Sequence, residues 1–196
     1  MITRITTVLF SSLALFLFLS ANAQSTERII LPTRSEGTIL DQFTFDGLPN
    51  TIDTRINQVQ LEGGQFDARA IIDFDLNVIP NGKRIARAIL VLMPLGRTFH
   101  PEDTSIPIEI RGFASNGVLQ LKDFHSGRFV RVIDGFPMEL GVRERVDVTA
   151  IVRDVFRSER KLVGFVLRTT ARGGMLFGSR GFVSPAKLEV VLVDAT

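Results

Sequence analysis

The sequence alternates apolar and polar residues with a period of two, and this pattern constrains the fold more than any other feature. Residues 70–76 show it most clearly, because one face carries only apolar residues: Ala70, Ile72, Phe74 and Leu76. Successive side chains of a β-strand point to opposite sides, so such a segment forms a strand with one buried face. The other face includes Asp73 and Asp75, and we interpret it as a solvated surface that Arg69 neutralises.

The same alternation predicts strands at 106–111 and 187–192, and two runs that are apolar on both faces predict central strands at 88–93 and 162–167. Further strand candidates are residues 28–31, 38–45, 56–61, 128–133 and 174–177. Glycine, proline and asparagine separate these segments at short intervals, as in all-β domains. We therefore expect one domain over residues 24–196, a jelly-roll-like antiparallel β-sandwich. Phe74 and Leu90 should anchor its core from adjacent strands of one hairpin.

One segment departs from the period of two. Thr149 can cap the start of a helix, and apolar residues at positions 151, 152, 155 and 156 then fall on one helical face. Basic residues follow at the end of this segment, where they complement the helix dipole. The pattern predicts one short helix packed on the sandwich.

Residues 1–23 have the form of a secretory signal peptide. Arg4 precedes an apolar run at 8–19, and Ala21-Asn22-Ala23 fits the small-x-small cleavage pattern. The apolar run is too short to span a bilayer, which takes about 20 residues. We expect cleavage after Ala23 and export of residues 24–196, without a membrane span, to the periplasm, the cell surface or the medium.

Charge and composition exclude several classes of function. The chain has 23 basic and 21 acidic side chains, so it lacks the concentrated basic field of a nucleic-acid-binding protein. It has no cysteine, which excludes disulfides, thiolate-bound metals and a thiol nucleophile. His100 and His125 are isolated in the sequence, and no Gly-x-Ser-x-Gly turn accompanies them. We expect a protein that is not an enzyme.

Three stretches follow one another in a characteristic order. The first runs from residue 68 to 76, through Ile79-Pro80-Asn81-Gly82, into residues 85–92. The second is Val146-Asp147-Val148-Thr149 with the predicted helix and Gly164-Phe165-Val166-Leu167. The third is Phe177-Gly178-Ser179-Arg180 with residues 187–190, and Leu48-Pro49-Asn50-Thr51 adds an upstream turn. Together they resemble the DNRLRE domain family, which is similar to a group of carbohydrate-binding modules of exported bacterial proteins.

This resemblance implies a jelly-roll-like sandwich that acts as an extracellular, non-catalytic module, and modules of this kind often hold a structural calcium ion. Calcium takes several oxygen ligands from loops. Asp41, Asp46 and Asp53 lie around the Pro49-Asn50 turn and are the candidate ligands. The same residues are equally suited to forming the turns themselves.

Two classes of function remain open. The first is a module that binds a polysaccharide, and the second is a structural or adhesive protein of the envelope or matrix that contacts another protein. The chain has 16 phenylalanines but no tryptophan or tyrosine, so stacking on sugar rings would fall to exposed phenylalanines such as Phe124 and Phe129. The structural class predicts instead an exposed apolar patch or an unpaired edge strand.

The densest basic group consists of Arg153, Arg157, Arg160 and Lys161. Guanidinium groups bind carboxylate and sulfate in a fork geometry, so this group favours an acidic polysaccharide if the ligand is a glycan. The helix dipole offers a purely structural explanation for the same residues.

Overall fold

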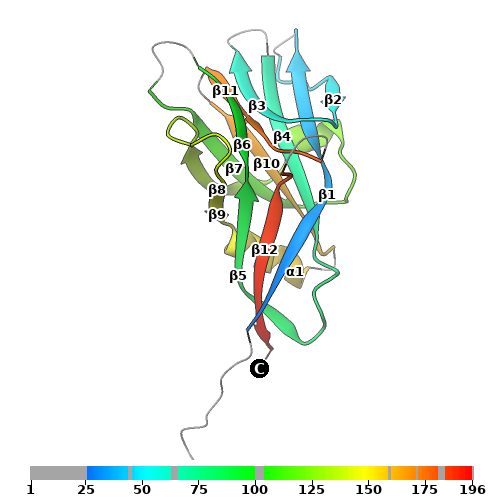
Figure 1. Ribbon diagram of the computed structural model, residues 1–196. Helices are drawn as coiled ribbons and strands as arrows, with labels where there is room; N and C mark the ends of the chain where they lie inside the picture. The colour runs from blue at the N-terminus through cyan, green and yellow to red at the C-terminus, as the bar shows by residue number, and fades with distance from the viewer. Residues whose placement is uncertain are drawn as a thin grey trace, which may run out of the picture.

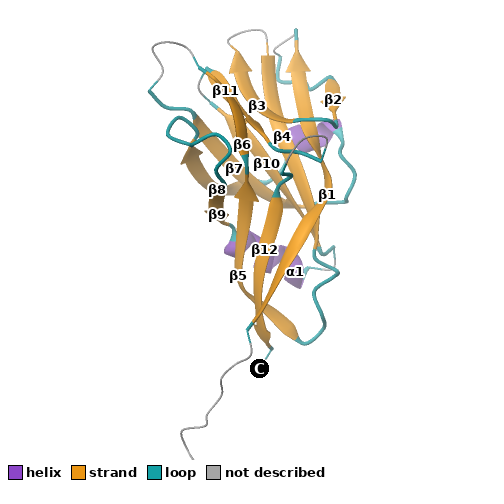
Figure 2. Cartoon of the chain, viewed as in Figure 1, coloured by secondary structure: helices purple, strands orange, loops and turns teal. Residues whose placement is uncertain are grey.

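The computed structural model describes residues 26–43, 46–62, 66–99, 104–158, 160–170, 172–180 and 184–195. The predicted signal peptide at 1–23 and His100 lie outside these ranges. Within them the chain is an antiparallel all-β sandwich with one short α-helix, as the alternation predicts (Figures 1 and 2). A search of the described helices finds none with the length and apolar character that a membrane crossing requires.

The strands are β1 (Glu27–Gln42), β2 (Thr51–Asp53), β3 (Asn57–Glu62), β4 (Phe66–Asp75), β5 (Lys83–Leu92), β6 (Pro94–Thr98), β7 (Pro107–Ala114), β8 (Arg128–Asp134), β9 (Glu144–Asp147), β10 (Leu162–Thr169), β11 (Gly173–Phe177) and β12 (Lys187–Asp194). The helices are α1 (Thr149–Arg157) and the 3-10 helix η1 (Leu121–His125). The sequence pattern does not predict β2, β6, β9 or η1. These elements are short, with three to five residues each, so they carry little periodic signal.

The strands form two facing layers (Figure 1). One layer contains β9, β5, β12 and the first half of β1, in that order. The other contains β8, β7, β10, β4, the second half of β1 and β2. Strand β3 pairs with residues 66–68 of β4, next to the segment of β4 that pairs with β10. Strand β11 pairs with β3, and β6 pairs with β11. Both predicted central strands are confirmed, because β5 and β10 each pair on two sides.

The long strand β1 belongs to both layers. Its residues 27–32 pair with β12, and residues 33–42 pair with β4, with a bulge between Thr33 and Ser35. The sequence pattern predicts two separate strands here, at 28–31 and 38–45, and the structure joins them into one. The bulge lies between the two predicted segments, and an extra residue there shifts which side of the strand faces the core.

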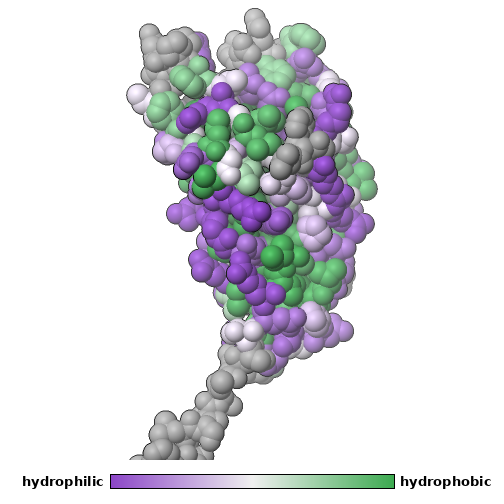
Figure 3. Space-filling model, in the orientation of Figure 1, coloured by the Kyte–Doolittle hydropathy of each residue, from purple (hydrophilic) through white to green (hydrophobic). Residues whose placement is uncertain are grey.

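The outer face of the first layer is crossed by an ion bridge. Glu189 of β12 pairs with Arg28 of β1 at 2.5 Å and with Arg145 of β9 at 2.6 Å. These two guanidinium groups hold the pKa of Glu189 at about 2, against an ordinary value of 4.5, chiefly through the hydrogen bond from Arg145. Figure 3 shows hydrophilic side chains across the middle of this face, with apolar side chains below them.

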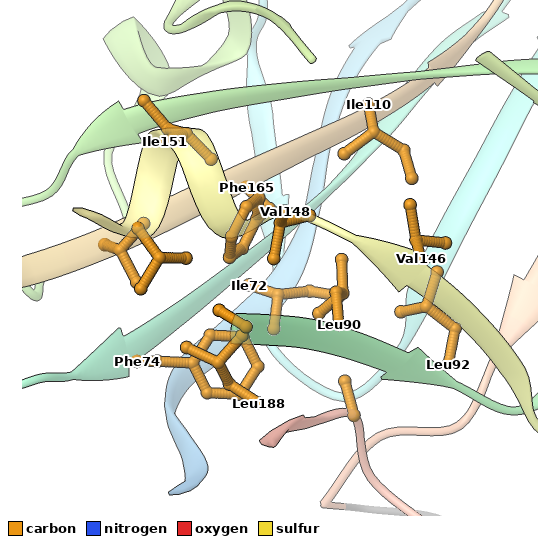
Figure 4. Packing of buried hydrophobic residues seen from close by; sticks show 14 of the residues in the cluster. Ile72, Phe74, Leu90, Leu92, Ile110, Val146, Val148, Ile151, Phe165 and Leu188 are labelled. Atoms are coloured by element: carbon orange, nitrogen blue, oxygen red, sulfur yellow. The ribbon is translucent and has the colours of Figure 1, made fainter. Parts of the chain in front are cut away.

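The main core fills the space between the two layers. Phe74 of β4 and Phe165 of β10 are fully buried and meet edge to face, with ring centroids 6.1 Å apart. Figure 4 shows their side chains beside Leu90 and Leu188 from the opposite layer. Strands near both ends of the chain, such as β1 and β12, contribute to this single cluster, so its packing joins distant parts of the sequence.

The predicted hairpin of Phe74 and Leu90 is wrong, although both residues are buried core anchors as expected. Among the described strands, β4 pairs with β1, β3 and β10, whereas β5 pairs with β12 and β9. The connection from Leu76 to Gly82 therefore carries the chain from one layer to the other. Phe74 and Leu90 meet across the core, because the apolar faces of both layers point inward.

Helix α1 closes one end of the sandwich against β5, β7 and β10, and it buries Ile151, Val152 and Val155 as the helical pattern predicts. The predicted cap is wrong. Thr149 is the first helical residue, and its hydroxyl accepts the Ala88 N–H at 3.0 Å. The carboxylate of Asp147 accepts the N–H of Thr149 at 2.9 Å. The Asp147 side chain therefore binds the first N–H of the helix, and the Thr149 hydroxyl ties the helix to β5.

The outward face of β4 is not the solvated surface expected from the sequence. Ile71 and Asp73 are each only 1% exposed, because residues 115–127, which we call the strap, cross this face. Phe124 of the strap packs with Ile71, Ile39 and Val166 in a second, smaller core. Arg69 pairs with Asp67 at 2.7 Å rather than neutralising Asp73. Local alternation cannot reveal such a cover, because the strap lies more than 40 residues further along the chain.

Replacing Phe74 with Ala should lower the free energy of unfolding by about 3–5 kcal/mol, because the substitution empties a fully buried site between the layers. Chemical denaturation followed by circular dichroism measures this difference. Phe129→Ala is the matched control. Phe129 is 59% exposed, so its loss should change stability by less than about 0.5 kcal/mol. Equal effects of the two substitutions would contradict the assignment of the strand faces.

Replacing Glu189 with Gln should remove a stabilising contribution that depends on pH. The folded-state pKa is depressed, so the contribution is complete above the ordinary glutamate value and is lost as pH falls toward 2. The half-exposed guanidinium groups are screened by solvent, so we expect a difference of about 1 kcal/mol at pH 7. Stability curves of both proteins from pH 7 to pH 2 should converge in acid. An exposed Glu139→Gln control should show no such convergence.

Candidate functional site

A continuous row of paired residues crosses six strands at the upper end of the sandwich. In strand order from β6 to β2 the row is Thr98, Gly174, Gln60, Ala68, Leu40 and Thr51. Paired residues of neighbouring strands place their side chains on the same face of a sheet. The second row across β6, β11 and β3 is Gly96, Leu176 and Gln58. On β6, β11 and β3 these rows form an outer face of amides, hydroxyls, glycines and aliphatic side chains, whereas at β4 and β1 the row passes through Ala68 and Leu40, which are buried.

Two adjoining hollows lie on this face. One has a volume of about 370 Å³ and lies over β3, β6 and β11, where Gln58, Gln60, Thr98 and Leu176 line it. The other has a volume of about 450 Å³ and is walled by β2 and the residues that follow it. Both include Ile56 and Gln58 in their lining, so we treat them as one feature, the strand groove. Figure 3 shows apolar and hydrophilic side chains intermixed in this upper region.

Gly174 keeps the floor of the strand groove flat. A Cβ atom at this position would lie 2.2 Å from the carbonyl oxygen of Val59, so any other residue would force β11 away from β3. The neighbouring residues Val59 and Met175 point to the opposite side, into the main core. The core therefore fixes these strands from behind, and the glycine lets β11 and β3 approach each other closely.

The charges at the strand groove are compensated. Arg55 pairs with Asp53 at 2.8 Å, and its hydrogen bond holds the pKa of the Asp53 carboxyl below its ordinary value. Arg97 donates to the carbonyl oxygen of Phe136. Gln58 donates to the side chain of Gln60. The polar groups available to a ligand are therefore mainly uncharged amides and hydroxyls.

The structure does not bring the predicted basic group together as a binding surface. Arg153 is partly buried, and its guanidinium donates to the carbonyl oxygens of Ile85 at 2.7 Å and Ala86 at 2.5 Å. Arg153 therefore fastens α1 to β5. Arg157 is exposed and lies 4.0 Å from Asp154, whereas the Lys161 ammonium lies 5.4 Å from the ring centre of Phe156. Arg160 is also exposed.

The two predicted stacking residues have opposite environments. Phe124 is fully buried in the strap, where the Arg69 guanidinium carbon lies 3.7 Å from its ring centre. It cannot contact a sugar. Phe129 is 59% exposed on β8, which pairs with β7 alone among the described strands. It lies on a different strand from those that form the strand groove.

The predicted calcium ligands form turns. The Asp41 carboxylate is buried and accepts the Gly47 N–H at 2.8 Å, and Asp46 accepts the Leu48 N–H at 2.9 Å. Asp53 is engaged with Arg55, as described above. No three His, Asp or Glu side chains of the described chain gather closely enough to hold a metal ion. The turn-forming alternative accounts for the hydrogen bonds of Asp41 and Asp46, and a calcium site at these residues stays a prediction.

Sequence analysis missed the residues of the strand groove. Gln58 and Gln60 alternate with Val59 inside the predicted strand 56–61, which signals one polar and one apolar face. That pattern alone does not distinguish an ordinary solvated face from a hollowed one. The distinction depends on β6 and β2, which the sequence pattern does not predict.

A scan of family models and a comparison with the curated proteins give no match for this chain. The resemblance to the DNRLRE family therefore stays a prediction from its motifs.

Replacing Gly174 with Ala should destabilise the protein by about 2 kcal/mol, because the new Cβ would collide with a backbone carbonyl in the middle of the sheet. Gly96→Ala is the matched control on the next strand. Its Cβ would lie 3.6 Å from Leu176, an ordinary contact, so stability should change by less than about 0.5 kcal/mol. Thermal unfolding of both variants measures the contrast. Tolerance of Gly174→Ala would show that β11 and β3 are less closely packed.

Proposed function

We propose that this chain is an exported, non-catalytic module that binds an extended polysaccharide in the strand groove. The observation that carries the proposal is the pair of adjoining hollows of the strand groove, whose lining joins amides and hydroxyls to aliphatic side chains. Sugar rings present hydroxyl groups at their edges and apolar C–H groups on their faces. A flat floor flanked by amides complements both parts.

The composition of the strand groove favours an uncharged glycan over the acidic one expected from the sequence. Arg55 is paired with Asp53, and Arg97 is bound to a backbone carbonyl. The arginines of the α1 segment do not line the strand groove, and Arg153 donates to the carbonyl oxygen of Ile85 on β5. Amides such as Gln58 and Gln60 can donate and accept hydrogen bonds, which suits neutral hydroxyl groups.

A binding role also fits the carboxylates better than glycoside hydrolysis does. Hydrolysis of a glycosidic bond commonly uses two facing carboxyl groups. The described lining of the strand groove includes one, Asp53, which is bound to Arg55. Asp73, the other carboxylate considered from the sequence, is buried beneath the strap on a different face.

The alternative, a structural or adhesive protein that contacts another protein, is favoured by one observation. Strand β8 lies at the edge of its layer and exposes Phe129 and Val132, which are 59% and 48% exposed. An edge strand with exposed apolar side chains can accept an added strand from another chain. The strand groove offers more converging polar groups, and we therefore place the polysaccharide first.

The proposal is tested with a panel of soluble and insoluble polysaccharides, neutral and acidic, in affinity electrophoresis and pull-down assays. We expect at least one neutral polymer to bind, with little dependence on salt. Gln58→Ala and Gln60→Ala together should weaken that binding about 30-fold, since each of the two neutral hydrogen bonds contributes roughly 1 kcal/mol. Neither side chain belongs to the core, so folding should persist.

The control variant is Arg157→Ala with Arg160→Ala, which removes exposed residues of the basic group predicted from the sequence. It should bind the neutral polymer like the unmodified protein. Salt-sensitive binding to an acidic polymer that this variant loses would refute the strand groove and support the arginine site. Failure of every polymer to bind would favour the protein-contact alternative.

A further inference from the structure

The strap is held on the outer face of β4, β7 and β10 by two arginines. Arg69 donates to the carbonyl oxygen of Phe124 at 2.8 Å, and Arg111 donates to that of Gly127 at 2.9 and 2.6 Å. Both contacts lie toward the end of the strap. Phe124 packs into the second core, and its helix η1 lies against β1 and β4 (Figure 2).

Two carboxylates are buried beneath and within the strap. Asp73 of β4 is 1% exposed, its Oδ2 accepts the Ser35 hydroxyl at 2.7 Å, and Ser115 of the strap is a second hydrogen-bond donor to this carboxyl. Its Oδ1 is buried without a hydrogen-bond partner in the described part of the chain. Asp123 of η1 is 7% exposed and accepts the Gln120 N–H at 2.9 Å. A buried, incompletely bonded carboxylate disfavours the charged form.

The surroundings of Asp73 offer little compensating charge. Gly164 of β10 lies so close that a Cβ there would be 2.6 Å from Asp73 Oδ1, and Phe113 of β7 occupies the same space. Neither residue is charged. On β1 the nearest cation is Arg34, which is bound to Asp75 at 2.9 Å. On η1 the titratable and charged neighbours of Asp123 are Lys122 and His125, both exposed.

The strap also touches the wall of the strand groove. A Cβ at Gly37 of β1 would lie 2.9 Å from Leu119 of the strap and 2.6 Å from the carbonyl oxygen of Asp53. Leu119 and the end of β2 therefore meet over the same point of β1. Strand β2 has three residues and pairs only with β1 in the described part of the chain, so it depends on such support.

We propose that the strap is a pH-sensitive device, in which protonation of Asp73 and Asp123 closes the strap and thereby orders the β2 wall of the strand groove. The effect on a ligand rests on the proposed function. The coupling between the strap and β2 does not require a ligand. The two carboxylates are the groups that change charge, Leu119 carries the change to β2, and the arginine contacts keep the end of the strap attached.

The direction of the effect follows from the buried carboxylates. Burial raises the pKa of Asp73, with a further contribution from the charge of Asp123, and burial also raises the pKa of Asp123. Groups with a raised folded-state pKa stabilise the closed form below the ordinary aspartate value. That stability is lost as pH rises through the raised values. The strap should therefore be tightest in acid and loosen toward neutral pH.

Hydrogen exchange followed by mass spectrometry, between pH 3.5 and 7.5, tests the coupling in the absence of a ligand. The proteins compared are the unmodified chain and Asp73→Asn, which keeps the shape of the side chain but carries no charge. At pH 7.5, peptides covering the strap and residues 51–55 should exchange about fivefold more slowly in Asp73→Asn. At pH 3.5, below the ordinary aspartate pKa of 3.8, the two proteins should exchange alike. Comparison at equal pH cancels the intrinsic effect of pH on exchange.

Asp194→Asn is the control, on β12 of the other layer, where the exposed carboxylate is paired to Lys83 at 2.8 Å. It should retain the pH response of the unmodified protein. Equal exchange of the unmodified chain and Asp73→Asn at pH 7.5 would overturn the proposal. A strap response without a response of residues 51–55 would overturn the coupling to β2. If Asp73→Asn does not fold, Asp123→Asn provides the same comparison.

A polymer bound in the strand groove should bind about fivefold more tightly at pH 3.5 than at pH 7.5, and this difference should disappear in Asp73→Asn. Failure of all polymers to bind would refute the proposed function but leave the exchange result decisive for the strap. Binding that is independent of pH, together with a pH-dependent strap, would show that the device does not regulate this site.

Discussion

The pairing of β1 with both layers is the constraint on which the rest of the structure depends. Its first half binds β12 and its second half binds β4 and β2, so one continuous backbone joins the two sheets. The bulge near Ser35 changes which side chains face inward. It lies beside Glu36, a buried carboxylate that accepts hydrogen bonds from Asn57 and from the backbone of Arg180. Beyond it, Gly37 receives the strap, and Leu40 enters the row of the strand groove.

Arginine acts mainly as an internal fastener in this protein. Glu189 and Glu109 each bind two guanidinium groups, and Arg69, Arg111 and Arg153 donate to backbone carbonyl oxygens. The planar guanidinium has five N–H donors on a long stem, so it can bond at the rim of a sheet while its stem covers apolar surface. A chain without disulfides gains cross-links between distant segments in this way. The abundance of arginine in the sequence therefore indicates little about the charge of a ligand.

The proposed site and its proposed regulation lie on opposite sides of the same strands. Leu40 contributes to the strand groove, whereas the adjacent Ile39 packs beneath the strap in the second core. Alternation along β1 therefore places consecutive residues in two environments that share one backbone. Because β2 is short and rests on β1, a change on the strap side reaches the groove through a few contacts. This arrangement needs no large movement of the sandwich.

The sequence by itself determined the local structure: the strand at 70–76, the central strands, the amphipathic face of α1 and the burial of Phe74. These follow from the period of apolar residues, which each segment carries within itself. Only the tertiary structure decided which strands pair, that the chain crosses between layers after Leu76, and that Asp73 is buried rather than solvated. Those outcomes depend on residues far apart in sequence, such as Phe124 over Ile71. The strand groove likewise exists only because β6, β11, β3, β4, β1 and β2 meet in one register, which no single segment encodes.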